Sequence, residues 1–175
     1  SYVFIIDEIN RGEVSKIFGE LFFSLDPSYR GKKGSISTQY SNMNETDEKF
    51  YIPENVYIIG TMNDIDRSVE SFDFAMRRRF RFIEVTAEDS INRMLEDNAI
   101  SSERANKAKV LNDKISEIEG LGKDYLIGGA YFKEVPDSDV ELWSDYLEPL
   151  LMSYLVGNYE NVKILDELKK IYDEN

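Results

Sequence analysis

The chain has 175 residues, of which 42% are hydrophobic, a net charge of −13, and neither cysteine nor histidine. This composition excludes disulfides, thiolate metal sites, the usual zinc ligands, and Ser-His or Cys-His catalysis. No apolar run reaches the length of a membrane span, and we expect a cytoplasmic protein without a membrane partner. Any chemistry must use carboxylates, amides, hydroxyls and arginines.

The first ten residues predict a strand that ends in two acids. Residues 2–6 are apolar or aromatic without a break, which is typical of a strand buried on both faces in a parallel sheet. Asp7 and Glu8 follow at its carboxyl end, where open α/β sheets place their ligands. Adjacent acids there suit Mg²⁺ and the activation of an attacking water. A strand that simply ends in a polar turn explains the pair about equally well.

The next segments predict a helix and an inserted hairpin. Apolar residues recur at helical spacing through residues 13–25, and Asp26-Pro27 ends the pattern. Residues 29–55 have the composition of a β-hairpin with a long polar tip. Arg30 belongs to a small basic cluster in this segment, which we interpret as a solvated turn.

A second short apolar strand covers residues 56–60 and is again followed by polar residues. If this strand is parallel to the first, Asn63 lies beside Glu8, where its amide could contact a terminal phosphate and the water being aligned. Taken alone, Asn63 is better explained as a turn residue.

An arginine run follows the next predicted helix. Residues 71–80 have helical spacing, residues 80–85 predict another strand, and four arginines lie around the junction: Arg77, Arg78, Arg79 and Arg81. A basic run is usually a solvated face, but the planar fork of arginine also fits phosphate. Because the flanking elements fix the position of the run, an arginine finger at a subunit boundary is the alternative.

The remaining residues predict an all-α unit. Amphipathic patterns cover residues 101–119, 140–156 and 159–172, with Gly120 as a helix stop and Pro149 as a kink or break. We place the domain boundary near Thr86. Residues 87–175 hold 20 acidic and 10 basic side chains, and such a surface repels the phosphate backbone of DNA.

Four segments in this order carry a resemblance to a known family: FIIDEINRG, the hairpin, FYIPENVYIIGTMNDIDRS and FDFAMRRRF. They resemble the McrB-type AAA+ GTPases of modified-cytosine (5-methylcytosine) restriction systems. Many P-loop enzymes share the Asp-Glu pair, whereas MNDIDRS followed by RRRF matches the family motif Met-Asn-x-x-Asp-Arg in register. The resemblance implies a partial α/β AAA+ core with an inserted hairpin in residues 1–86 and an all-α lid in residues 87–175.

The resemblance also implies roles for individual residues. Asp7 resembles the Walker B residue that serves Mg²⁺, and Glu8 resembles the catalytic glutamate. Asn63 resembles the sensor-1 asparagine. Arg78 and Arg79 resemble the pair that reaches the nucleotide of a neighbouring subunit, and the sequence does not choose between them as the finger. Further positions that match the family's site are Asn10, Asp66, Arg67 and Asp73.

Two departures from the family pattern matter. The phosphate-binding loop G-x-x-x-x-G-K-[ST] of Walker A is absent. We therefore expect the C-terminal part of a longer protein, and no nucleotide binding or turnover by this chain alone. Gly128-Gly129-Ala130 stands where relatives often carry Gly-His-Ser, which puts a contribution of the lid to nucleotide contacts in doubt.

For the longer protein, the resemblance implies hydrolysis of GTP, or with less support ATP, in a homo-oligomeric ring expected to be a hexamer. The implied partners are an McrC-like nuclease subunit and DNA, the latter through an N-terminal domain and not through this segment. One alternative is a MoxR-like AAA+ ATPase acting as a metal-insertion or assembly chaperone. Another is a non-hydrolysing scaffold, against which the intact Asp7, Glu8 and Asn63 argue.

Overall fold

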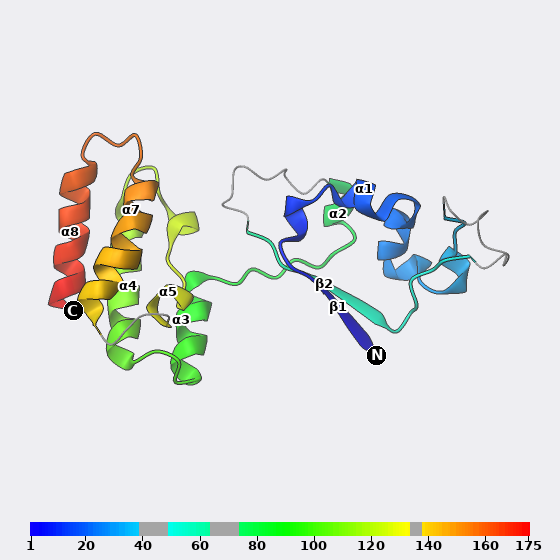
Figure 1. The fold of residues 1–175 in the computed structure, drawn as a ribbon, viewed down its shortest axis with the longest axis horizontal. Helices are drawn as coiled ribbons and strands as arrows, with labels where there is room; N and C mark the ends of the chain where they lie inside the picture. Colours follow the sequence, from blue (N-terminus) through cyan, green and yellow to red (C-terminus); the bar gives the residue numbers. More distant parts are fainter. Residues whose placement is uncertain (39–48, 64–73, 134–137) are drawn as a thin grey trace. The chain divides into compact units, whose positions relative to one another are not determined.

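The chain folds into two compact units, Ser1–Ile83 and Glu84–Asn175 (Figure 1). The structure is a computed structural model, and it describes residues 1–38, 49–63, 74–133 and 138–175. Among these residues, none of the helices combines the length and the apolar character needed to cross a membrane.

The first unit is built on a two-stranded parallel sheet. Strand β1 (Tyr2–Ile6) pairs with β2 (Val56–Gly60), in a register that runs from Tyr2 opposite Val56 to Ile6 opposite Gly60. The pairing confirms the prediction of two parallel strands. The helices of this unit are α1 (Val14–Phe18), α2 (Phe74–Arg77), and 3-10 segments at Ile9–Arg11, Gly19–Leu25, Pro27–Tyr29 and Lys32–Gly34.

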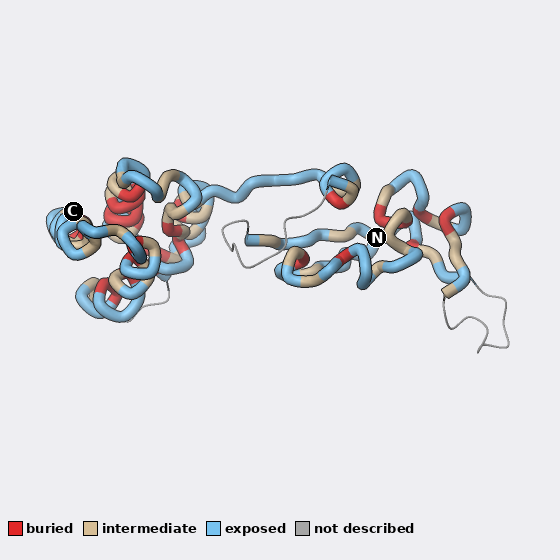
Figure 2. The backbone as a smooth tube through the Cα atoms, turned by 90° about the horizontal axis from the view of Figure 1, so that it is seen from above, coloured by how far each residue is buried: buried red, intermediate tan, exposed pale blue. Residues whose placement is uncertain are grey.

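A small core covers only one face of this sheet. It contains the buried residues Ile9, Val14, Leu25, Ile52 and Met76, against which Ile6, Val56 and Ile58 pack. Val3, Ile5, Tyr57 and Ile59 alternate with these positions and are more than half exposed (Figure 2). Tyr2 and Phe4, on the same face of β1 as Ile6, are more than half exposed as well. The prediction that β1 is buried on both faces is therefore wrong for the described residues, because only Ile6 of this strand packs against the core.

Two predicted elements differ from the structure. The predicted helix over residues 13–25 is α-helical only to Phe18, because Gly19 takes a φ of 49°, which glycine reaches readily, and the chain continues as a 3-10 segment. The predicted strand over residues 80–85 is wrong. Ile83 and Val85 are exposed there, and no strand in the described part of the chain pairs with this segment.

The segment between α1 and β2 contains one antiparallel bridge, Ile36 opposite Phe50. The predicted tip of the hairpin falls on residues 39–48, which lie outside the described residues, so the hairpin stays a prediction. Arg30 is only 8% exposed and donates hydrogen bonds to the carbonyls of Val56 (2.6 Å) and Leu25 (3.0 Å). Burial lowers the pKa of its guanidinium, so the interpretation of Arg30 as part of a solvated turn is wrong.

The second unit consists of helices around a larger core (Figure 2). The longest are α3 (Ala87–Glu96), α4 (Ser102–Glu117) and α8 (Asn161–Glu174). The predicted helices over residues 101–119 and 159–172 correspond to α4 and α8. Shorter helices are α5 (Ala130–Lys133), α6 (Asp139–Leu142), α7 (Glu148–Tyr154) and a 3-10 turn at Lys123–Tyr125.

The predicted break near Pro149 is a widened helical turn. Helix α6 continues into a π-helical turn, Trp143–Leu147, in which the N–H of Glu148 donates to the carbonyl of Trp143. Pro149 then lies in the first turn of α7. Proline has no N–H to donate, and the widened turn directly before it is where this continuous helix accommodates the missing hydrogen bond.

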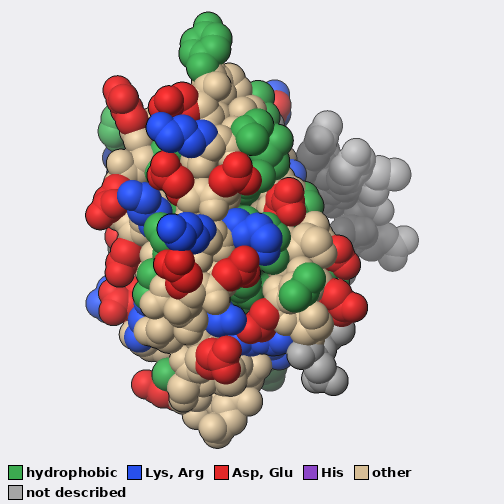
Figure 3. Space-filling model, turned by 90° about the vertical axis from the view of Figure 1, so that its left-hand side faces the viewer, with side chains coloured by type: hydrophobic (Ala, Val, Ile, Leu, Met, Phe, Trp, Pro, Cys, Tyr) green, Lys and Arg blue, Asp and Glu red, His purple; other side chains and the backbone are tan. Residues whose placement is uncertain are grey.

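Partly buried charged side chains connect helices α4 and α6. Asp139 of α6 accepts hydrogen bonds from Lys107 Nζ (2.7 Å) and Arg104 Nε (3.1 Å), both from α4. The hydrogen bond from Lys107 is the main cause that lowers the pKa of Asp139. Acidic and basic side chains intermingle on the face seen in Figure 3. The exposed ion pairs of this unit, such as Arg93–Asp97 and Lys169–Asp173, contribute little stability.

We predict that the Asp139 contact stabilises the second unit in a pH-dependent way. Because folding lowers the pKa of Asp139, its contribution is present above the ordinary carboxyl value of 3.8 and is lost as the pH falls through the folded-state pKa. Asp139→Asn should lower the unfolding temperature by several degrees at pH 7 and by less at pH 3, below the ordinary carboxyl value, where part of the contribution is already lost. Thermal unfolding followed by circular dichroism measures this difference. Asp113→Asn, on the exposed side of α4, is the matched control, and an effect of Asp139→Asn that is equal at both pH values would contradict the prediction.

Candidate active site

The parallel pairing brings two polar segments together at the carboxyl ends of β1 and β2. Beyond the last pair of the ladder, the N–H of Thr61 donates to the carbonyl of Ile6 (3.0 Å), and the N–H of Ile9 donates to the carbonyl of Thr61 (2.8 Å). These two bonds enclose Asp7 and Glu8. Thr61 therefore lies directly beside the predicted acidic pair.

The hydroxyl of Thr61 contacts both predicted acidic residues. Its Oγ1 donates to Oδ1 of Asp7 and accepts the backbone N–H of Glu8 at 3.0 Å. Glu8 has a φ of 50° and a ψ of 49°, in the left-handed region that non-glycine residues rarely adopt. The strands thus hold the two acids in a defined and strained turn. Sequence reasoning did not single out Thr61, although a hydroxyl residue directly after a parallel strand was the available signal.

The side chains of Asp7 and Glu8 both face solvent. Glu8 forms an ion pair with Arg11, three residues later, and both of these side chains are about half exposed (50% and 56%). An exposed pair of this kind is weak, since water screens the attraction. The carboxylate of Glu8 can therefore exchange Arg11 for another partner at small cost.

Asn10 and Asn63 also meet at this edge. The side-chain Nδ2 of Asn10 donates to the backbone carbonyl of Asn63 at 3.1 Å, across 53 residues of sequence. The structure thus brings Asp7, Glu8, Asn10 and the backbone of Asn63 to one end of the sheet. The other predicted positions, Asp66, Arg67 and Asp73, lie outside the described residues.

Asp7 can supply one ligand for a magnesium ion. The described residues contain no cluster of three or more acidic side chains that could hold a metal by itself. Mg²⁺ in nucleotide sites, however, is bound through one or two carboxylates together with phosphate oxygens and water. Thr61 engages Oδ1 of Asp7, which leaves Oδ2 for the water shell of such an ion. The donor set fits a metal that arrives with phosphates.

The arginines at the end of α2 have different surroundings. Arg79 is half-buried, its Nη1 donates to the carbonyl of Ala75, and its guanidinium lies 4.2 Å from the ring centre of Phe22. Arg78 is exposed, and its side chain makes no hydrogen bond or ion pair with any residue that the structure describes. Their charges add only minor contributions to the lowered pKa of Asp26, whose main cause is the hydroxyl of Ser28. Arg79 is engaged within its own unit, whereas Arg78 is available.

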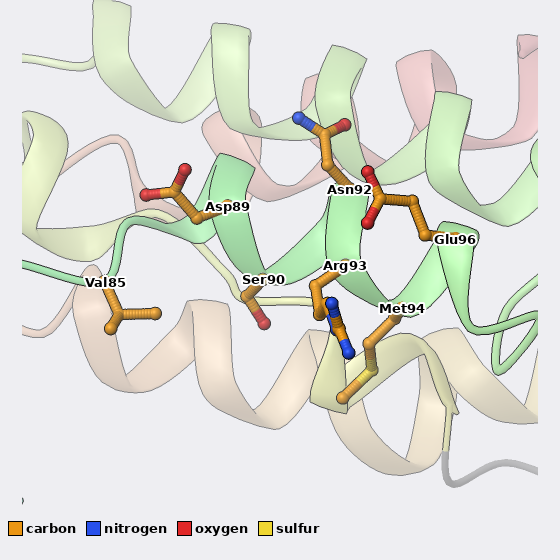
Figure 4. A pocket seen from close by; sticks show the side chains of 7 residues that line it. All are labelled: Val85, Asp89, Ser90, Asn92, Arg93, Met94 and Glu96. Carbon is orange, nitrogen blue, oxygen red and sulfur yellow. The ribbon is translucent and has the colours of Figure 1, made fainter.

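A hollow along α3 in the second unit contains none of the predicted site residues. Its lining includes Asp89, Ser90 and Arg93, which all come from α3 (Figure 4). Asp89 belongs to the cap of α3: it accepts from the hydroxyl and the N–H of Thr86, and these bonds lower its pKa. Asp89, one of the two acids that line the hollow together with Glu96, is thus engaged at the helix end.

The Gly128-Gly129 pair packs tightly against α3. The N–H of Gly129 donates to Oγ of Ser90 at 3.1 Å, and a β-carbon at Gly129 would lie 2.9 Å from the carbonyl oxygen of Ser90. A histidine at this position would force the backbone apart. The departure from Gly-His-Ser therefore goes with a close contact that only glycine allows here.

Residues 1–80 match the family model of the AAA domain (dynein-related subfamily). Over 140 residues, 75% of the chain, the sequence is 43% identical to the Type IV methyl-directed restriction enzyme EcoKMcrB subunit of Escherichia coli (strain K12). Over 89 residues, 47% of the chain, it is 32% identical to the Type II restriction enzyme BsuMI component YdiS of Bacillus subtilis (strain 168). The matched regions span 30% and 26% of these two relatives.

We predict that the two arginines differ in their contribution to stability. Arg79→Ala removes the stacking on Phe22 and the bond to Ala75, and it should destabilise the first unit by about 1–2 kcal/mol. Arg78→Ala, one residue away, is the matched control and should leave the unfolding temperature unchanged. Differential scanning calorimetry checks both variants. Equal losses of stability in both would contradict the assignment.

Proposed function

We propose that this chain is part of an McrB-type AAA+ protein of a restriction system and carries the hydrolytic residues of a nucleotide-driven motor. The observation that carries the proposal is the convergence of Asp7, Glu8, Thr61 and the Asn10–Asn63 contact at the carboxyl ends of two parallel strands. Ligands of open α/β sheets bind at this edge.

In the proposed reaction, each residue has a separate task. Asp7 holds the water shell of Mg²⁺, which when bound neutralises charge on the phosphates. Glu8 leaves its weak pair with Arg11 and accepts hydrogen bonds from the attacking water, which it polarises. Asn63 orients that water and the terminal phosphate. Asp66, Arg67 and Asp73 complete the family motif in this proposal on the strength of sequence alone.

For the arginine finger, we favour Arg78 over Arg79. A finger must reach across to the nucleotide of a neighbouring subunit, and such a residue supplied in trans raises the rate by about three to five powers of ten. Moving Arg79 would break its contacts with Phe22 and Ala75, whereas Arg78 is exposed and has no such contact to lose among the described residues. In this proposal Arg79 fixes the end of α2 and Arg78 projects from it.

For the whole protein, we take the proposed activity and assembly from the resemblance to the McrB-type family. We propose a ring-shaped homo-oligomer, expected to be a hexamer. It hydrolyses GTP in preference to ATP and drives an McrC-like nuclease subunit. Residues 1–86 form part of the AAA+ core with its hairpin, and residues 87–175 form the lid. Modified DNA is bound by another domain in this proposal, because the acidic surface of this chain repels the phosphate backbone of DNA. A phosphate-binding loop outside this sequence supplies the main anchor for the nucleotide.

Two other functions are weighed against this proposal. A MoxR-like ATPase chaperone would share the Asp-Glu pair, but the two relatives are both described as parts of restriction enzymes. A non-hydrolysing scaffold would not need a strained turn at Glu8. Both arguments favour the restriction motor.

We predict that Glu8→Gln in the full-length protein abolishes most hydrolysis but preserves nucleotide binding and ring assembly. The amide is nearly isosteric and Asp7 still serves the metal, yet an amide cannot polarise water as a carboxylate does. Single-turnover GTP hydrolysis should fall by several orders of magnitude, while the dissociation constant for GTP stays within about threefold. Hydrolysis at a near wild-type rate would disprove the assignment of Glu8. Glu13→Gln, on an exposed residue before α1, is the matched control.

We predict that mixing two inactive variants restores activity. Arg78→Ala and Glu8→Gln should each be inactive in the full-length protein. Mixed rings contain some interfaces with an intact Glu8 facing an intact Arg78, and these interfaces should hydrolyse GTP. The assay compares turnover before and after mixing, with native mass spectrometry to verify that mixed rings form. Mixed rings without turnover would show that the arginine does not act between subunits.

A further inference from the structure

Thr61 is the point at which the two strands and the two proposed acids are joined. Its backbone donates to Ile6 and accepts from Ile9 (3.0 and 2.8 Å), so its place relative to residues 6–9 is fixed by main-chain bonds on both sides. Its hydroxyl is then aimed into the turn between those bonds. A hydroxyl has one proton to donate, and Thr61 donates it to Oδ1 of Asp7.

The same oxygen accepts the N–H of Glu8 at 3.0 Å. This bond matters because Glu8 takes a left-handed backbone conformation, with a φ of 50° and a ψ of 49°. Such a conformation persists in a non-glycine residue only where the surroundings hold it. One side chain therefore constrains the orientation of one carboxylate and the backbone that carries the other.

From this geometry we infer that Thr61 is a positioning residue that couples the metal-serving carboxylate of Asp7 to the water-polarising carboxylate of Glu8. The inference rests on the proposed function, because it takes its meaning from the roles of the two acids. Thr61 itself touches neither nucleotide nor water in this scheme. It leaves Oδ2 of Asp7 free and sets the direction in which Glu8 projects.

A positioning role can be separated from a merely structural one by matched substitutions. Thr61→Val keeps the shape of the side chain and removes both hydroxyl bonds, whereas Thr61→Ser keeps both bonds. Thr86 offers a control of the same chemistry: its hydroxyl also donates to a carboxylate, that of Asp89 (2.7 Å), and accepts a backbone N–H (3.0 Å), but it only caps α3. Thr86→Val should lower the unfolding temperature and leave kcat unchanged.

The test uses the full-length protein and two readouts. Thr61→Val should lower kcat for GTP about 10- to 100-fold with KM nearly unchanged, as expected for a residue that orients metal-site groups, and Thr61→Ser should retain the wild-type kcat. Mn²⁺, used in place of Mg²⁺ with a non-hydrolysable GTP analogue, should bind about tenfold more weakly to Thr61→Val, measured by electron paramagnetic resonance. In the Glu8→Gln background, Thr61→Val should add little further loss of hydrolysis.

Three outcomes separate the possibilities. An active wild type with unchanged kcat and Mn²⁺ affinity in Thr61→Val would overturn this inference and leave the proposed function intact. Equal losses in Thr61→Val and Thr61→Ser, in parallel with their unfolding temperatures, would assign Thr61 a structural role only and overturn it as well. A full-length wild type that binds no nucleotide and hydrolyses none would overturn the proposed function itself.

Discussion

The register of β1 against β2 is the constraint on which the candidate site depends. Because Ile6 lies opposite Gly60, the residues that follow each strand emerge side by side, and Thr61 reaches the turn formed by Asp7 and Glu8. A slip of one residue would turn the alternating side chains to the opposite face of the sheet and carry the hydroxyl away from both acids. The contacts between Asn10 and Asn63 and between Ile9 and Thr61 extend the same register beyond the ladder, so the pairing of two short strands organises residues more than 50 positions apart.

The sequence predicted those parts of the fold that short-range patterns specify. Apolar runs ending in polar residues identified β1 and β2, and helical spacing identified α4 and α8. It was wrong for residues 80–85, because an apolar run becomes a strand only where it pairs with another strand, and neither β1 nor β2 pairs with this segment although each has a free edge. It was also wrong for Arg30, whose burial depends on carbonyls of Leu25 and Val56 that local composition does not reveal.

The candidate site shows the same division between local and tertiary information. Asp7, Glu8 and Asn63 could be selected because carboxylates and amides after parallel strands are recognisable as a pattern. Thr61 could not be distinguished from any hydroxyl residue after a strand until its two hydrogen bonds were known. Likewise, Arg78 and Arg79 are equivalent in sequence. Only the position of Phe22, more than 50 residues away, makes Arg79 an internal contact and leaves Arg78 exposed.

Exposure of the acids has a consequence for how such a site would be controlled. Asp7, Glu8 and Arg78 all face solvent, where water screens each charge and weakens its effect on a reacting phosphate. Positioned charges stabilise a transition state strongly only after water is excluded. The strands and Thr61 can set the direction of the two carboxylates in advance, but they do not enclose them. Under the proposed function, closure by other surfaces, including that of a neighbouring subunit, would supply the low-dielectric surroundings. Assembly would then switch on catalytic groups that are already oriented, which is a physical reason for dividing Glu8 and Arg78 between the two sides of an interface.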